Sequence, residues 1–108
     1  MDYKEFGLTE HELKCLKYLL KNKVAFAKEI ERKFDLRQPQ VSTALKNLMQ
    51  KGWVDFKQTK KDRRGRPQNV YYLIKTKEEI FKDLEKTIEE KRTELIEKFE
   101  KLKQEIGA

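Results

Sequence analysis

The sequence predicts a mostly helical α+β fold, in which three helices and a two-stranded β-hairpin form a small domain and one long helix follows. Three observations predict it. Apolar residues recur at helical spacing as far as Gly52, and the spacing becomes that of strands after this glycine. Residues 76–105 then contain neither glycine nor proline. We therefore expect a compact domain over residues 1–75 and a helical extension over residues 76–108.

The first helix is expected over about residues 9–22. Thr9 is a suitable N-cap and Glu12, three residues later, is the capping-box partner. Leu8 and Leu13 occupy the positions of a hydrophobic staple. The buried stripe of this helix is expected to consist of Leu13, Leu16 and Leu20, with Leu19 beside them.

Two more helices should follow a short bridge over residues 23–26, which is a candidate for a brief strand. The second helix is expected over residues 27–34, with Ile30 and Phe34 on its buried face. After a turn, Gln38-Pro39 opens the third helix, because proline lacks the N–H that has no partner in the first helical turn. Gly52 marks its end. The inward stripe of the third helix is Val41, Ala44, Leu45 and Leu48.

The hairpin is predicted from a change of period after Gly52. Residues 53–57 have the pattern of a strand, and residues 70–74 are dense in β-branched and aromatic side chains. Residues 60–67 between them are too polar to bury and are expected to form a long basic loop at the tip.

The extension is expected to be one amphipathic helix of about 45 Å. Its apolar residues recur in steps of seven and also in steps of eleven, and these two registers imply opposite supercoil hands. The domain is too small to cover so long a stripe, so a partner helix, most simply from a second copy, is expected. Lys91 and Arg92 interrupt the stripe midway. The expected dimer interface consists of Phe81, Leu84, Ile88, Leu95, Phe99 and Leu102.

Charge and composition limit the classes of partner and the cellular compartment that we expect for the protein. The chain has 108 residues, a net charge of +7 and a pI of about 9.4. Residues 1–75 carry 18 Lys and Arg against 9 Asp and Glu, whereas residues 76–108 carry 8 against 10. This distribution favours a polyanion bound by the first part, with nucleic acid ahead of an acidic membrane. A single cysteine and the lack of an apolar segment indicate a cytoplasmic protein without a membrane span.

The order of elements resembles a winged helix-turn-helix domain. Residues 38–54, with their polar first turn, Val-Ser, Leu-x-x-Leu stripe and Gly-Trp-Val, are similar to the recognition helix of bacterial and archaeal winged-helix regulators. Arg64-Gly65-Arg66-Pro67 followed by Tyr71-Tyr72-Leu73 resembles the wing of the MarR, ArsR and TrmB-like groups. The resemblance covers residues 9–75 and implies a DNA-binding transcriptional regulator whose long C-terminal helix forms a homodimer.

Two surfaces are then expected to contact double-stranded DNA. A helix fits the major groove, where glutamine can pair with adenine and lysine can reach guanine or phosphate. Arg-Gly-Arg-Pro matches the core of the AT-hook, in which glycine allows close approach to a narrow minor groove and arginine follows its negative potential. The recognition-helix candidates are Gln38, Gln40, Ser42, Thr43, Lys46 and Asn47. The wing candidates are Lys57, Lys60, Lys61, Arg63, Arg64, Gly65 and Arg66.

Other classes of function have less support. The spacing of His11 and Cys15 suits a metal, but the chain contains no other histidine or cysteine to complete such a site, so we expect no metal, no cofactor and no enzyme activity. Any effector would bind at the dimer interface, and the sequence does not identify one. Two alternatives remain open, an architectural DNA-binding protein with little sequence preference and a protein-interaction adaptor.

Overall fold

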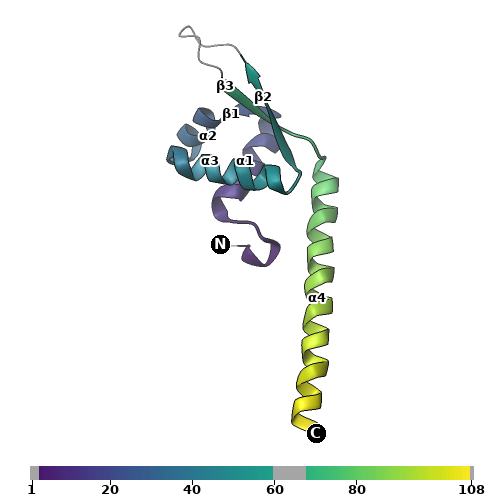
Figure 1. The fold of residues 1–108 in the computed structure, drawn as a ribbon. Helices are drawn as coiled ribbons and strands as arrows, with labels where there is room; N and C mark the ends of the chain where they lie inside the picture. Colours follow the sequence, from purple (N-terminus) through teal and green to yellow (C-terminus); the bar gives the residue numbers. More distant parts are fainter. Residues whose placement is uncertain (1–2, 60–67, 108) are drawn as a thin grey trace.

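The computed structural model describes residues 3–59 and 68–107, and the main elements follow the expected order (Figure 1). A 3₁₀ turn, η1 (Lys4–Phe6), precedes them and was not expected from the sequence. The elements are α1 (Glu10–Asn22), β1 (Val24–Phe26), α2 (Ala27–Phe34), α3 (Gln38–Gln50), β2 (Val54–Thr59), β3 (Gln68–Leu73) and α4 (Lys77–Gly107). The predicted mostly helical α+β fold, a winged helix with a long C-terminal helix, is confirmed.

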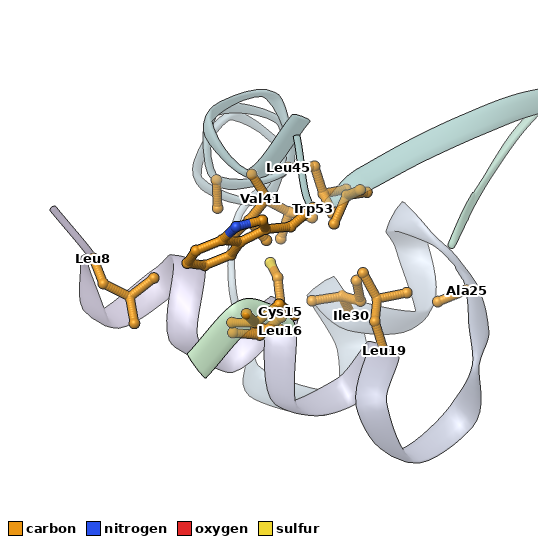
Figure 2. Close-up of a cluster of buried hydrophobic side chains, with 13 residues drawn as sticks. Leu8, Cys15, Leu16, Leu19, Ala25, Ile30, Val41, Leu45 and Trp53 are labelled. Atoms are coloured by element: carbon orange, nitrogen blue, oxygen red, sulfur yellow. The ribbon is translucent and has the colours of Figure 1, made fainter. Parts of the chain in front are cut away.

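The core lies between the first three helices and the base of the hairpin, as Figure 2 shows. Leu19, Ile30 and Leu48 are fully buried, and the predicted inward stripe of α3 is buried along its whole length. On α1 the prediction was partly wrong, because Leu20 is exposed and the buried positions are Glu12, Cys15, Leu16 and Leu19. The face that packs is therefore rotated relative to the leucine stripe, and it includes a carboxylate.

The helix ends follow the local sequence signals. Thr9 caps α1, since its hydroxyl accepts a hydrogen bond from the Glu12 backbone N–H at 3.2 Å. The Glu12 carboxylate does not return to Thr9 as a capping box requires, because it is directed to α3 instead. At the start of α4, Thr76 and Glu79 form the reciprocal capping box. Gly52 has a φ of 79°, the left-handed conformation that ends α3 at low cost.

The sheet has one strand more than the predicted two-stranded hairpin. Its order is β1-β3-β2 with antiparallel pairs, so the bridge after α1 joins the hairpin along β3. Ala25, Tyr71 and Phe56 are paired across the three strands and lie on one face, which covers the helices. The sheet thereby ties the hairpin to the helical core and fixes its direction relative to α3.

The long helix leaves the domain after its first turns. Figure 1 shows α4 extending away from the rest of the chain, and the longest dimension of the molecule is 72 Å. Ile80 is buried in the core, and Leu84 packs against the N-terminal segment through Phe6 and Leu8. Lys91 donates a hydrogen bond to the backbone oxygen of Glu5. Within the described residues, none of the helices is apolar enough over sufficient length to span a membrane.

Candidate nucleic-acid interface

The outer side of α3 presents a continuous polar surface. Ser42, Thr43 and Lys46 are exposed, while Ala44 and Leu45 between them are buried in the core. Gln38 is also exposed, at the first position of the helix. Four of the six residues predicted to read DNA from this helix are thus displayed together at its N-terminal two-thirds. This is the part of a recognition helix that reaches base edges.

Gln40 has a structural partner. Its side-chain oxygen accepts a hydrogen bond from the backbone N–H of Arg37 at 2.8 Å, which satisfies one of the unpaired donors at the start of α3. A contact of the Gln40 amide with adenine has to compete with this bond. The sequence prediction overlooked it, although a glutamine at the third helical position is a recognised capping signal.

Asn47 faces the domain and not the open side of α3. Its amide donates to the Glu12 carboxylate at 2.9 Å, and the Lys51 ammonium lies 3.4 Å from the other oxygen of that carboxylate. Glu12 is only 2% exposed. The signal for its burial was present in the sequence, because Glu12 shares a helical face with Cys15, Leu16 and Leu19.

The hairpin holds the two ends of the basic segment together. Thr59 is paired with Gln68 across the strands, and the Thr59 hydroxyl donates to the Gln68 backbone oxygen at 3.3 Å. Lys57 is exposed on β2. The other six wing candidates, Lys60, Lys61, Arg63, Arg64, Gly65 and Arg66, lie outside the described residues. Thr59 and Gln68, which flank this segment in the sequence, are thus held side by side at the ends of β2 and β3.

A hollow of about 660 Å³ separates α2 from the end of β3. Arg32 of α2, Gln38 of α3 and Asn69 of β3 line it together with Lys28. Sequence reasoning did not single out Lys28 or Arg32, since α2 was considered only for its buried face. Both are exposed, and Glu29 and Glu31 line the same hollow, so its charge is mixed.

The environment of the Cys15 thiol makes it unreactive. It is fully buried, and burial raises its pKa to about 12, with a smaller contribution from the negative charge of Glu12. His11 is partly exposed on the first turn of α1. Within residues 3–59 and 68–107, no group of three or more His, Cys, Asp or Glu side chains is placed to hold a metal ion.

This burial predicts how Cys15 reacts. A thiol whose pKa is about 12 is protonated at neutral pH, and the thiolate is the reactive form, so native protein should resist alkylating reagents at pH 8. Protein unfolded in guanidinium should react fully within the same time. Mass spectrometry of the alkylated chain measures both. Rapid modification of the native protein would show that Cys15 is accessible.

A polar cluster joins the base of the hairpin to α4. The indole N–H of Trp53 donates to Asp83 at 2.7 Å, and the Lys75 ammonium lies 2.9 Å from the same oxygen. The hydrogen bond from Lys75 and, after it, that from Trp53 hold the pKa of Asp83 below its usual value. Trp53 is nearly fully buried, so this contact fixes the direction in which α4 leaves the domain.

Beyond this junction α4 displays a row of large apolar side chains. Leu95 is 69% exposed and Ile106 is 76% exposed in the single chain. At about 100° per residue the row occupies a sector only about 60° wide along the helix. The row is interrupted once, between Ile88 and Leu95, where Lys91 and Arg92 lie. The members of this row, here called the α4 stripe, are Phe81, Leu84, Ile88, Leu95, Phe99, Leu102 and Ile106.

Comparison with known proteins agrees with this geometry. Residues 3–78 match the profile of a family described as "Sugar-specific transcriptional regulator TrmB". No curated protein sequence matches the chain significantly.

Several solved structures share the fold. A possible transcriptional regulator from Methanosarcina mazei Go1 is similar with a TM-score of 0.74 at 17% identity, over 90% of this chain and 81% of that one. A transcriptional regulator homologue from Pyrococcus horikoshii OT3 has a TM-score of 0.57 at 20% identity, over 85% and 94% of the two chains. Overoxidized AbfR bound to DNA has a TM-score of 0.60 at 25% identity, over 96% and 75%.

Proposed function

Because the chain belongs to the TrmB family of transcriptional regulators, a family of DNA-binding proteins and not of enzymes, we propose that it binds specific sites in double-stranded DNA as a homodimer. In this proposal α3 enters the major groove, and the basic segment between β2 and β3 contacts the minor groove or the backbone. Such a protein acts where the chromosome lies, in the cytoplasm.

The exposed polar side of α3 carries this proposal. Ser42, Thr43 and Lys46 stand on the face opposite the buried stripe, and none of the three has a partner within the described residues that would hold it back. Base contacts specify a sequence and phosphate contacts position the protein on it. We therefore assign base reading to Ser42 and Thr43, with Lys46 mainly setting affinity. Gln40 can read a base only after its hydrogen bond with the Arg37 backbone N–H has broken.

The homodimer is supported by the α4 stripe. Six of its seven side chains are between 48% and 76% exposed, and burial of each large apolar side chain is worth about 1.5–3 kcal/mol. Leu84 is the exception, because it packs partly on its own domain. A second copy has the same narrow stripe, and pairing two stripes covers both. The expected dimer interface therefore starts at Phe81 and continues from Ile88 to the end of the helix.

Titration of labelled nucleic acid tests this function. The full chain is added to a duplex and to a single strand of the same length, at 50 and 200 mM salt, and anisotropy is recorded. We expect tighter binding to the duplex and a loss of affinity of 10-fold or more between the two salts, in the manner of several phosphate contacts. Absence of duplex binding at 50 mM salt would favour the adaptor alternative.

Regulation by cysteine oxidation is not part of the proposal. Two of the similar solved structures are described as disulfide-formed and overoxidized AbfR. In this chain the single cysteine is buried with a raised pKa, which opposes oxidation because the thiolate is the form that oxidises.

The wing provides a further prediction. Arg66→Ala is expected to weaken duplex binding several-fold, and Arg64→Ala less strongly, with little change in stability because both belong to a segment too polar for a core. If Arg66 enters the minor groove, the loss should be larger on A·T-rich flanks, where that groove is narrow. Anisotropy titrations of both variants on A·T-rich and G·C-rich duplexes measure this. Unchanged affinity of both variants at about 150 mM salt would remove the wing from the interface.

A further inference from the structure

A buried carboxylate lies directly beneath the recognition helix. Glu12 is 2% exposed, and it is the buried polar or charged residue of the described part of the chain. It accepts hydrogen bonds from Asn47 at 2.9 Å and from Lys51 at 3.4 Å, two residues one turn apart on α3. Every buried side-chain nitrogen or oxygen in the described residues has a partner, so this small network is complete.

Stability alone is a poor explanation for such a group. Removing a charge from water is costly, and buried ion pairs replaced by well-packed apolar side chains often leave a protein equally or more stable. The remaining α1–α3 contact is apolar, through Cys15, Leu16, Val41, Leu45 and Leu48. Apolar packing has no directional preference, whereas a hydrogen bond specifies both distance and angle.

The contact of Glu12 with Asn47 and Lys51 lies on the same side of α3 as Thr43. Thr43, Asn47 and Lys51 follow one another at four-residue intervals and therefore form one row along α3. A hollow of about 360 Å³ lies between the start of α1 and this row, lined by Thr9, Thr43 and Asn47 among others. On this side of α3 Thr43 therefore borders the hollow, and one turn later the bond from Asn47 to Glu12 ties the row to α1.

We propose that Glu12 is a positioning residue, which sets the rotation of the recognition helix about its own axis and thereby the bases that Thr43 and its neighbours prefer. Glu12 does not touch DNA. This inference rests on the proposed sequence-specific binding and adds to it a specificity-determining group buried in the domain. It also reassigns Asn47, which holds the helix from within and does not read bases.

The test compares Glu12→Leu with Glu12→Gln in the full chain. Leucine cannot accept the bond from Asn47, whereas the glutamine carbonyl can. The readout is discrimination, the ratio of affinities for the preferred duplex and for single-base variants of it, where a wrong base pair ordinarily weakens binding roughly 5- to 150-fold. We expect Glu12→Leu to lower this ratio about threefold or more and Glu12→Gln to restore it. Leu16→Val serves as the matched control, because it removes one buried methylene group of α1 without touching the network.

A second variant tests the inference even if the first does not fold. If Glu12→Leu is too unstable to assay, the double variant Glu12→Leu/Asn47→Leu removes the carboxylate and the buried amide together. It should fold, since the remaining member of the network, Lys51, has a side chain that is 25% exposed and can turn its ammonium to water. We expect this variant to keep its melting temperature and lose discrimination. Wild-type discrimination by either leucine variant, or an equal loss in Glu12→Gln, would overturn the inference. A wild-type chain without any discrimination would instead overturn the proposed function and the inference with it.

Discussion

Truncation of the chain after Arg92 is expected to give a folded monomer that binds DNA roughly 10²- to 10⁴-fold more weakly than the full chain. This cut keeps every contact that α4 makes with its own domain, from Ile80 through Asp83 to Lys91. It removes the distal part of the α4 stripe, which has no other partner in the described chain. Two linked domains gain avidity of this order without any new contact.

Sedimentation measures the mass of the full and the truncated chain, and a titration of each on the same duplex measures affinity. The fluorescence of Trp53, the single tryptophan, reports whether the junction with Asp83 is intact. Two double variants of the full-length chain distinguish the loss of dimer contacts from the mere shortening of α4. Leu95→Glu/Phe99→Glu places charge on the stripe, and Glu97→Gln/Lys101→Gln changes the opposite face. A monomeric full chain at tens of micromolar, or a truncated chain that binds equally tightly, would exclude the stripe as the dimer interface.

Thr43→Glu is expected to reduce duplex binding about 100-fold, which corresponds to about 2.8 kcal/mol. Thr43 is exposed on the side of α3 assigned to the major groove. A carboxylate there loses the hydroxyl contact and adds repulsion from the phosphates. The free energy of unfolding should change by about 0.5 kcal/mol or less, as at other exposed positions.

Gln50→Glu is the control for this substitution. It makes the same change of charge on an exposed residue of the same helix, but at the C-terminal end, which we do not assign to base reading. Anisotropy titration and thermal melting of the two variants are compared with wild type. Equal losses of affinity in both would mean that net charge, and not the position of Thr43, determines binding, as the architectural alternative requires.

The elements were predictable because their signals are local. Thr9 and Gly52 mark helix ends, and the steps of four and three residues between Val41, Leu45 and Leu48 identify the buried side of α3. The exposed candidates on the other side of α3 followed directly from that stripe.

The features that escaped prediction depend on distant partners. Residues 23–26 were a candidate strand, but the partner of β1 was not predicted, because β3 follows more than 40 residues later. The local spacing places Glu12 on the buried face of α1, but its hydrogen-bond donor, Asn47, lies 35 residues away. Leu84 was assigned wholly to the dimer, but it also packs against an N-terminal segment whose short 3₁₀ turn has no clear signal in the sequence. Such pairings are decided by the assembled domain and not by local spacing.

Selection of bound duplexes from a random pool, followed by sequencing, tests whether the protein binds specific DNA sites as a dimer. The full chain is incubated with the pool at about 150 mM salt, and the bound fraction is amplified and selected again. A sequence-specific dimer should select a palindrome whose half-sites lie about one helical turn, or a multiple of it, apart. The enriched duplex should bind about 10³-fold or more above random DNA. A bound fraction with no enriched sequence, and equal affinity for selected and random duplexes, would contradict sequence-specific binding.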